Sequence, residues 1–458
     1  MKGLSVPLVR QSSGTSYEQS SLQSSQLGSL PGSNRISPDA AILWNRTRTD
    51  TKELIDRAFP HVVVKPALRI RDDMRFQTMG ELLFDLIYIF VLQQMFLITW
   101  SPTGVAYYVL YFMLAWNGWA GVSFFNTRFD TDDLPARAVA LMNMVAVVGM
   151  SVGAGRPVET GFGLYVASYM VMRIMLVLQY TRAWCALPGG RQLTGRFIIG
   201  FSCGVACWAV FVSLTYAGCT GIPRWLFLAL GLLCDYGTPF AVIPWMVSVH
   251  GPHITDRFAG WIVLMFTGTL FNFVQTMGHP SKNLFHEYLF CALTGLLLAF
   301  LEILLYSYLP GADLEGFEES LTQRFKVYIF LYLHMPLASI ITLCSISMGH
   351  IQCLTQVALI ANCQWDPTLW LQSSMCGATL VMLGVLHLLS ANRNSWRAAV
   401  RIACGVVLLA VYPAFPRMQC RAVLLTIVSV LSFQVMMDYT VCVQPPRKVL
   451  TSSSVEES

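Results

Sequence analysis

The chain has 458 residues, of which 55% are hydrophobic and only 12% carry a charged side chain. Its mean hydropathy of +0.55 lies well above that of soluble domains, which excludes a soluble enzyme or binding module and predicts a polytopic membrane protein. The formal net charge of +5 is concentrated in the N-terminal tail and in short loops, which favours a cytoplasmic face and gives no sign of nucleic-acid binding.

Residues 1–75 form a Ser- and Gln-rich segment whose low-complexity part reads QSSGTSYEQSSLQSSQLGSLPGS. This composition predicts a disordered cytoplasmic tail, whose serines are either phosphorylation sites or parts of a solvated tether. No apolar segment follows the first basic residues, so we expect no signal peptide and an uncleaved first membrane helix. The sequence Asn45-Arg46-Thr47 is a glycosylation sequon, and its modification in cells would place this tail outside.

Residues 76–443 carry about twelve apolar segments of spanning length, taking roughly 20 residues per helix. The segments are 82–100, 105–125, 137–152, 161–180, 197–216, 225–247, 258–277, 287–308, 327–348, 369–389, 398–414 and 422–443. The predicted fold class is therefore all-α, a polytopic transmembrane helix bundle, followed by a short cytoplasmic tail at 444–458. The polar stretch 350–366 is expected to be an interfacial or re-entrant piece.

Connections rich in Lys and Arg alternate along the chain with connections poor in them. With the N terminus inside, the inner loops and the C-terminal tail would hold Arg128, Arg137, Arg182, Arg191, Arg196, Arg257, Arg324, Lys326, Arg393, Arg397, Arg401, Arg447 and Lys448. The outer loops would hold only Arg156, Arg224, Lys282, Arg417 and Arg421. Both termini are therefore predicted to be cytoplasmic, in the plasma membrane or an organelle membrane.

Two acidic loops suggest an internal repeat. FDTDDLP at 129–135 follows the second segment and PGADLEGFEE at 310–319 follows the eighth, at an offset of roughly 180 residues. This offset would suit two parallel six-helix halves.

Ionisable residues at spanning depth form a candidate transport and charge network: Glu81, Asp85, Arg173, Asp235, Glu302, His334 and Asp438. Glu81 and Asp85 share one face at the mouth of the first helix, where a buried acid could exchange protons or pair with a base. Arg173 needs an acidic partner or an aqueous path, and Asp85, Asp235 and Glu302 are available.

Two of these candidates have open alternatives. Asp235 precedes Gly237 and Pro239, which could break the sixth helix at an ion-binding site or only kink it. His334 could relay protons or simply pack among other side chains.

A charged loop after the second helix is a candidate gate. It lacks the glycine and ligand spacing of a calcium loop, so we favour a gating salt bridge between Asp256 and Arg257 with Arg128 nearby. The predicted gating residues are Arg128, Asp130, Asp132, Asp133, Asp256 and Arg257.

The thirteen cysteines are scattered, and several, such as Cys376, lie in apolar runs where they act as small hydrophobes. No C-x-x-C or Cys/His pattern is present, so no metal site and no cofactor are expected.

Four separated motifs carry a family resemblance. ELLFDLIYIF at 81–90 resembles the E-L-F-F-D-L-V-F-V-F signature of the low-temperature-requirement-A family of membrane proteins, and WAGVSFFNTRFDTDDLP at 119–135 resembles its W-x-x-F-x-N-R-F-D-T-D-D stretch. HITDRFAGWIVLMFTG at 253–268 and YLHMPL at 332–337 are similar to two further family motifs. Asp256 stands where the family usually has Glu, and Thr269 stands where it has an intramembrane Glu, which puts any activity needing that acid in doubt.

The resemblance implies a fold more than a function. Together with the intramembrane charges it favours a secondary transporter or permease, with proton coupling through a carboxylate, acting on a small solute or ion across the lipid bilayer. The alternatives are a receptor or regulatory scaffold that signals through the serine-rich tail, and an ion channel. No H-E-x-x-H, G-x-S-x-G or nucleotide loop is present, so no enzyme is expected. The pattern specifies neither a substrate nor an oligomeric state.

Overall fold

The computed structural model describes residues 66–68, 77–95, 102–131, 133–246, 251–276, 285–309, 320–357, 367–390, 395–414 and 418–442. Apart from residues 66–68, the predicted tails 1–75 and 444–458 lie outside these ranges, and so does the sequon at Asn45.

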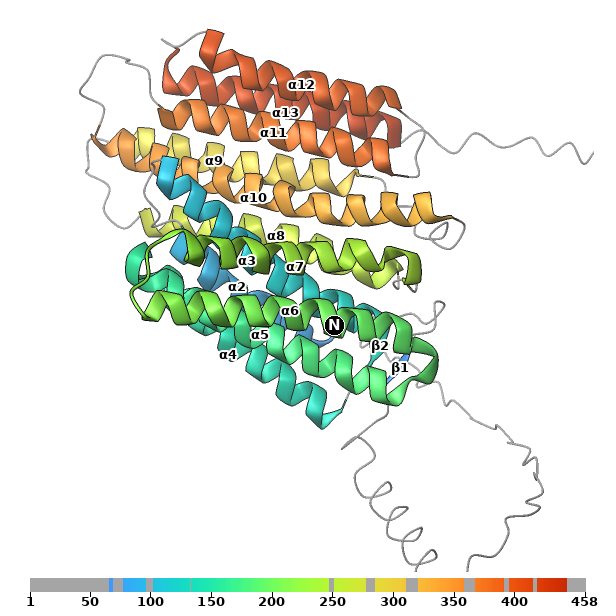
Figure 1. The fold of residues 1–458 in the computed structure, drawn as a ribbon. Coiled ribbons are helices and arrows are strands. Elements are labelled where there is room, and N and C mark those ends of the chain that lie inside the picture. The colour runs from blue at the N-terminus through green and yellow to red at the C-terminus, as the bar shows by residue number, and fades with distance from the viewer. Residues whose placement is uncertain are drawn as a thin grey trace, which may run out of the picture. The chain divides into compact units, whose positions relative to one another are not determined.

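The described residues form twelve α-helices, as the apolar segments predict (Figure 1). They are α2 (Met79–Met95), α3 (Pro102–Arg128), α4 (Leu134–Ala154), α5 (Val158–Ala186), α6 (Arg191–Tyr216), α7 (Ile222–Val242), α8 (Gly251–Thr276), α9 (Phe285–Ser307), α10 (Leu321–Val357), α11 (Pro367–Leu389), α12 (Ser395–Ala414) and α13 (Cys420–Cys442). Eight spans, in α4–α7, α9–α11 and α13, are long and apolar enough to cross a membrane.

Short elements complete the described fold. The 3-10 helices η1 (Pro188–Gly190) and η2 (Ile243–Trp245) adjoin α6 and α7. The strands β1 (Ala67–Leu68) and β2 (Phe129–Asp130) pair antiparallel directly after α3. The chain just before the bundle is thereby tied to the end of α3.

The order of helix neighbours in α2–α7 recurs in α8–α13. In the first set α4 packs on α5, α5 on α6, α6 on α7, α2 on α4 and α3 on α5. Each contact recurs six helices later: α10 packs on α11, α11 on α12, α12 on α13, α8 on α10 and α9 on α11. The grouping of α11, α12 and α13 is visible in Figure 1. This recurrence supports two six-helix halves, although the loop 310–319 used for that prediction lies outside the described residues.

Helix α3 is the most enclosed element of the first half. It contacts α2, α5, α8 and α10, and Trp116, Trp119 and Leu114 are fully buried. Trp119 stacks on Trp261 of α8 with 4.4 Å between ring centroids. A helix that is apolar on all sides packs in a core, so α3 can place polar groups toward two different neighbours at once.

Two local expectations change. Helix α10 continues to Val357, so residues 350–357 of the predicted interfacial or re-entrant piece extend the ninth helix, and residues 358–366 lie outside the described residues. Helix α7 stays helical from Asp235 through Pro239 to Val242, so the helix is not broken there. Proline removes one backbone donor but does not by itself end a helix whose sides are packed.

Candidate functional site

A cavity of about 470 Å³ lies among the first turns of α2 and α4 and the C-terminal halves of α3 and α5. Its volume falls in the range of small-molecule sites, roughly 300–1,000 Å³. Its wall mixes apolar side chains with acids, a base and amides: Thr78, Gly80, Glu81, Phe84, Val122, Asn126, Phe129, Asp130, Thr131, Ala136, Arg137, Ala140, Asn143 and Gln179.

Glu81 is held at this cavity by the start of α2. The backbone N–H of Thr78 donates to Glu81 Oε2 at 3.0 Å, and the Glu81 N–H donates to Thr78 Oγ1 at 3.2 Å. This is a capping box, in which two helix-terminal donors are satisfied reciprocally. Glu81 Oε1 also lies 3.6 Å from Nε2 of the buried His253. The carboxylate therefore begins the helix and lines the cavity wall.

Asp85 is paired on the inner side of the same helix. Its Oδ2 lies 2.8 Å from Arg257 Nη1, and it accepts hydrogen bonds from Trp119 Nε1 at 2.7 Å and Gln77 Nε2 at 2.6 Å. Arg257 Nη2 donates to Ser123 Oγ at 2.9 Å. A buried ion pair is tolerated when further hydrogen bonds support both charges. Here Arg257 Nη1 also donates to the Glu81 carbonyl at 3.2 Å, while Arg257 Nε has no partner within the described residues.

Arg173 and Asp235 form a second buried pair, so Asp235 is the partner among the predicted acids. Arg173 Nε lies 3.2 Å from Asp235 Oδ2, which also accepts from Tyr169 Oη and, at 2.9 Å, from Trp208 Nε1. The amide of Asn117 donates to Tyr169 Oη at 2.9 Å. Each of the two acids is thus matched with one arginine and one indole N–H.

Helix α3 separates these two ion pairs. Trp119 hydrogen-bonds Asp85, and Ser123 hydrogen-bonds its partner Arg257. Asn117 and Gly121 lie on the side of the Arg173–Asp235 pair, where they contact Tyr169 and Arg173. A Cβ at Gly121 would lie 2.7 Å from Arg173 Nη1, so the absence of a side chain there admits the guanidinium.

Two buried amides on the cavity wall carry polar atoms that have no hydrogen-bond partner among the described residues. Both side-chain atoms of Asn143 and the Oε1 atom of Gln179 are buried and have no hydrogen-bond partner within the described part of the chain. Asn143 is 1% exposed. Buried polar groups without partners are uncommon in folded proteins and point to a bound polar group or to water.

The predicted gate takes a different form. Arg257 is buried and pairs with Asp85, whereas Asp256 is exposed, because consecutive residues of α8 point in different directions. Arg128 points inward and hydrogen-bonds Tyr328. The salt bridge predicted between Asp256 and Arg257 is therefore wrong.

The acids of the gating loop also separate. Asp133 accepts from the N–H of Ala136 as the N-cap of α4 and pairs with Arg182. Asp130 lies on β2 and lines the cavity, while Asp132 lies outside the described residues. One of these acids is therefore a structural cap and another faces the cavity.

The remaining predicted residues lie elsewhere in the bundle. Asp438 of α13 pairs with Arg397 at 2.9 Å and Arg401 at 2.7 Å. These two arginines were assigned to an inner loop from the sequence, but both are buried in α12. His334 bonds through Nδ1 to the Phe330 carbonyl at 2.9 Å and packs among aromatic rings.

The predicted network does not converge on one cavity. Asp85, Arg173 with Asp235, and Asp438 belong to three separate ion-paired clusters, and Glu302 contacts Cys344 in the second half. Of the predicted network residues, Glu81 alone is among the residues that line the large cavity.

The helices and the buried charge pairs define an integral, multi-pass membrane protein. The family model described as bacterial low temperature requirement A protein matches residues 77–436, the bulk of the chain, so the chain belongs to that family. No curated protein and no solved structure matches the chain.

Sequence reasoning missed the residues that complete the site. The Thr78-Met79-Gly80-Glu81 run is a recognisable capping-box pattern that was available in the sequence. Asn143, Gln179 and Trp208 lie in apolar segments without a motif, and only the packing of several helices reveals their roles.

Proposed function

We propose that this protein is a secondary transporter that binds a small polar solute or ion in the cavity lined by Glu81, Asn143 and Gln179. The main support for this proposal is the cavity itself. It combines a volume of about 470 Å³ with buried amide groups that have no hydrogen-bond partner in the described part of the chain. A ligand with both donor and acceptor groups would satisfy Asn143, and a cationic group would face Glu81.

Proton coupling in this proposal involves Glu81 and the neighbouring Asp85–Arg257 pair. Carboxylates inside membrane proteins commonly mark proton pathways. Protonation of Asp85 would weaken its ion pair with Arg257 and so loosen α2 from α8. Because α2 supplies one wall of the cavity, the change at Asp85 would reach the solute site.

The same proposal assigns transport rather than enzymatic catalysis to the cavity. The carboxylates, amides and single arginine of its described wall suit the binding of a polar solute.

The test uses the full chain in proteoliposomes with an imposed pH gradient. Uptake of radiolabelled amino acids, sugars and monovalent cations is measured together with an entrapped pH dye. Glu81→Gln should abolish proton-linked uptake without unfolding the protein, because glutamine can keep the capping box. The exposed Asp256→Asn is the matched control.

Two results would refute the assignment of proton-linked transport to this cavity and its ion pairs. One is uptake that stays unchanged in Glu81→Gln. The other is uptake that stays unchanged when Asp85→Asn is combined with Arg173→Ala, since these substitutions disrupt both ion pairs of the first half.

A receptor or regulatory scaffold is the second candidate. It is favoured by the separation of the ion pairs into clusters with their own hydrogen bonds, which is typical of fixed structural networks. Deletion of residues 1–72 should then abolish signalling and leave the membrane domain inserted, whereas a transporter without the tail should keep its uptake.

A further inference from the structure

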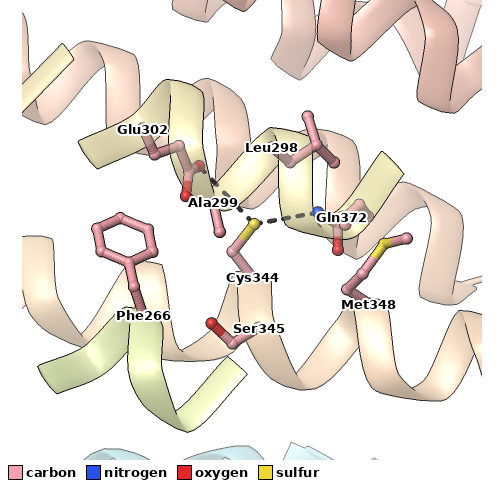
Figure 2. A pocket seen from close by; sticks show the side chains of 9 residues that line it. Phe266, Leu298, Ala299, Glu302, Cys344, Ser345, Met348 and Gln372 are labelled. Atoms are coloured by element: carbon pink, nitrogen blue, oxygen red, sulfur yellow. Dashed lines mark hydrogen bonds between the residues drawn. The ribbon is translucent and has the colours of Figure 1, made fainter. Parts of the chain in front are cut away.

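Three metal-ligating side chains from three helices meet in the second half of the bundle. Glu302 of α9, Cys344 of α10 and Cys376 of α11 are buried, and one ligand atom of each lies within 4.8 Å of the others. The Cys344 sulfur is 3.8 Å from Glu302 Oε1 and 3.4 Å from the Cys376 sulfur. Figure 2 shows Glu302 and Gln372 directed toward the Cys344 sulfur.

These spacings fit ligands around one tetrahedral ion. With Zn–S bonds of about 2.3 Å and Zn–O bonds of about 2.0 Å, tetrahedral geometry separates two sulfurs by about 3.8 Å and a sulfur from an oxygen by about 3.5 Å. The observed separations of 3.4 and 3.8 Å lie within a few tenths of an ångström of those values. Small side-chain rotations would close that gap.

Glu302 differs from the acids of the three ion-paired clusters. Asp85, Asp235 and Asp438 each pair with arginine, but within the described ranges Glu302 has no basic side chain at ion-pair distance. A carboxylate buried at membrane depth without a counter-charge is costly. A divalent ion would supply that charge to the carboxylate and to both sulfurs.

The surrounding groups fit thiolate ligands. Gln372 Nε2 lies 3.1 Å from the Cys344 sulfur and 3.5 Å from the Cys376 sulfur, so its N–H groups can donate to both. Ser347 hydrogen-bonds Gln372 Oε1, which turns the amide nitrogen toward the sulfurs. Outer-shell hydrogen bonds of this kind orient ligands and tune a metal site.

A small cavity adjoins two of the ligands, Glu302 and Cys344. It has a volume of about 10 Å³ and is lined by Glu302, Cys344, Gln372 and Met348 among others. This is close to the space occupied by one water molecule, so a single ion or its bound water fits and an organic ligand does not.

We propose that Glu302, Cys344 and Cys376 bind one Zn²⁺ ion, with the fourth coordination position directed into the small cavity. Two thiolates select a soft or borderline metal, and the carboxylate favours zinc over monovalent copper. The ion would join α9, α10 and α11. The spacing rules applied to the sequence could not find the site, because its ligands lie on three different helices, with 42 residues between the first two ligands and 32 between the last two.

The test uses the purified full chain in detergent micelles with a phosphine reductant. Metal is removed with a chelator, Zn²⁺ is titrated, and the bound metal is counted by mass spectrometry. We expect one Zn²⁺ per chain and a higher midpoint of thermal unfolding when the ion is bound. Replacement by Co²⁺ should give a thiolate-to-cobalt absorption band.

Variants locate the site. Glu302→Gln, Cys344→Ser and Cys376→Ser should each weaken Zn²⁺ binding at least about tenfold. Cys291→Ser, at a buried cysteine of α9 outside this cluster, should leave it unchanged. Since a variant can fail to fold, the cobalt band of the unmodified chain serves as an independent measurement.

Four results would overturn the proposal. The first three are the absence of stoichiometric Zn²⁺ binding by the unmodified chain, binding that none of the three variants weakens, and a cobalt complex without thiolate absorption. A disulfide between Cys344 and Cys376 in protein alkylated directly in cells would overturn it as well, because both sulfurs would then be unavailable to the metal.

Discussion

Asp85 of α2 and Arg257 of α8 form a buried ion pair with 2.8 Å between Oδ2 and Nη1, and they lie 172 residues apart in the chain. One turn earlier, Glu81 and His253 face each other at 3.6 Å with the same separation in sequence, 253 − 81 = 172. Both contacts therefore keep the same register between α2 and α8. Since all four residues are near helix N-termini, α2 and α8 begin at the same end of the bundle, as six helices per half require.

Removal of one partner of this pair should destabilise the protein strongly. Asp85→Asn leaves the Arg257 guanidinium buried without a counter-charge, which typically costs about 3–5 kcal/mol. Thermal and denaturant unfolding in micelles measure the loss. Adding Arg257→Gln to Asp85→Asn should recover part of it, because the uncompensated charge is then removed.

The matched control for this ion pair is Asp256→Asn, which lies next to Arg257 on α8 but is exposed. It should change the free energy of unfolding by no more than about 0.5 kcal/mol. Equal losses for Asp85→Asn and Asp256→Asn would contradict the assignment of Asp85 as the partner of Arg257.

The two buried asparagines Asn143 and Asn117 should respond differently to leucine. The Asn143 amide has no partner within the described chain, so Asn143→Leu should leave the stability unchanged or raise it by about 1 kcal/mol. Asn117→Leu removes the hydrogen bond to Tyr169 beside Asp235 and should cost about 1–3 kcal/mol. Unfolding midpoints of both variants measure the contrast.

Activity gives the second readout for this pair of asparagines. If Asn143 contacts the transported solute, Asn143→Leu lowers uptake while the protein remains at least as stable as the unmodified chain. A variant that is destabilised as much as Asn117→Leu would show that Asn143 has a structural partner instead.

Replacement by alanine should have opposite effects on stability at two glycines, Gly405 and Gly260. A Cβ at Gly405 of α12 would lie 2.6 Å from the carbonyl oxygen of Gly377 on α11, which is too close for any real contact. Close backbone approach at small residues is a common way to pack membrane helices. Gly405→Ala should therefore cost about 1–3 kcal/mol through overpacking.

At Gly260 of α8 a Cβ would have no atom within 4 Å. Gly260→Ala should stabilise the protein by up to about 1 kcal/mol, because alanine has the higher helix propensity. The free energy of unfolding of both variants, measured under the same conditions, gives the sign of each change. A stabilising Gly405→Ala would mean that α11 and α12 are further apart than described.

The helices were predictable from the sequence, and the partners of the buried charges mostly were not. Segment length and apolar content set each span, so all twelve helices are found close to their predicted positions. The sequence places Arg257 in a loop gate because the seventh apolar segment begins only at residue 258, but α8 already begins at Gly251. Once that turn is helical, Arg257 faces inward and Asp256 faces outward.

The sites themselves depend on relations between helices that no local pattern encodes. Asn143 and Gln179 come from adjacent helices, and Glu302 meets Cys344 across 42 residues. The sequence marks Glu302 as unusual because it is a charge in an apolar run. It gives no signal that two of the scattered cysteines lie beside it.

The predicted orientation can be tested with two exposed cysteines at opposite ends of the bundle. Cys185 lies at the C-terminal end of α5, the same end as the N-terminus of α2, and Cys219 follows α6 at the other end. With the termini in the cytoplasm, a membrane-impermeant maleimide should label Cys219 in intact cells and Cys185 only after permeabilisation. The variants Cys219→Ser and Cys185→Ser each remove one cysteine and keep all the others. The variant that loses the maleimide signal therefore identifies the labelled residue. Labelling of Cys185 in intact cells, or glycosylation at Asn45, would reverse the topology, and the Glu81 cavity would then lie at the outer end of the bundle.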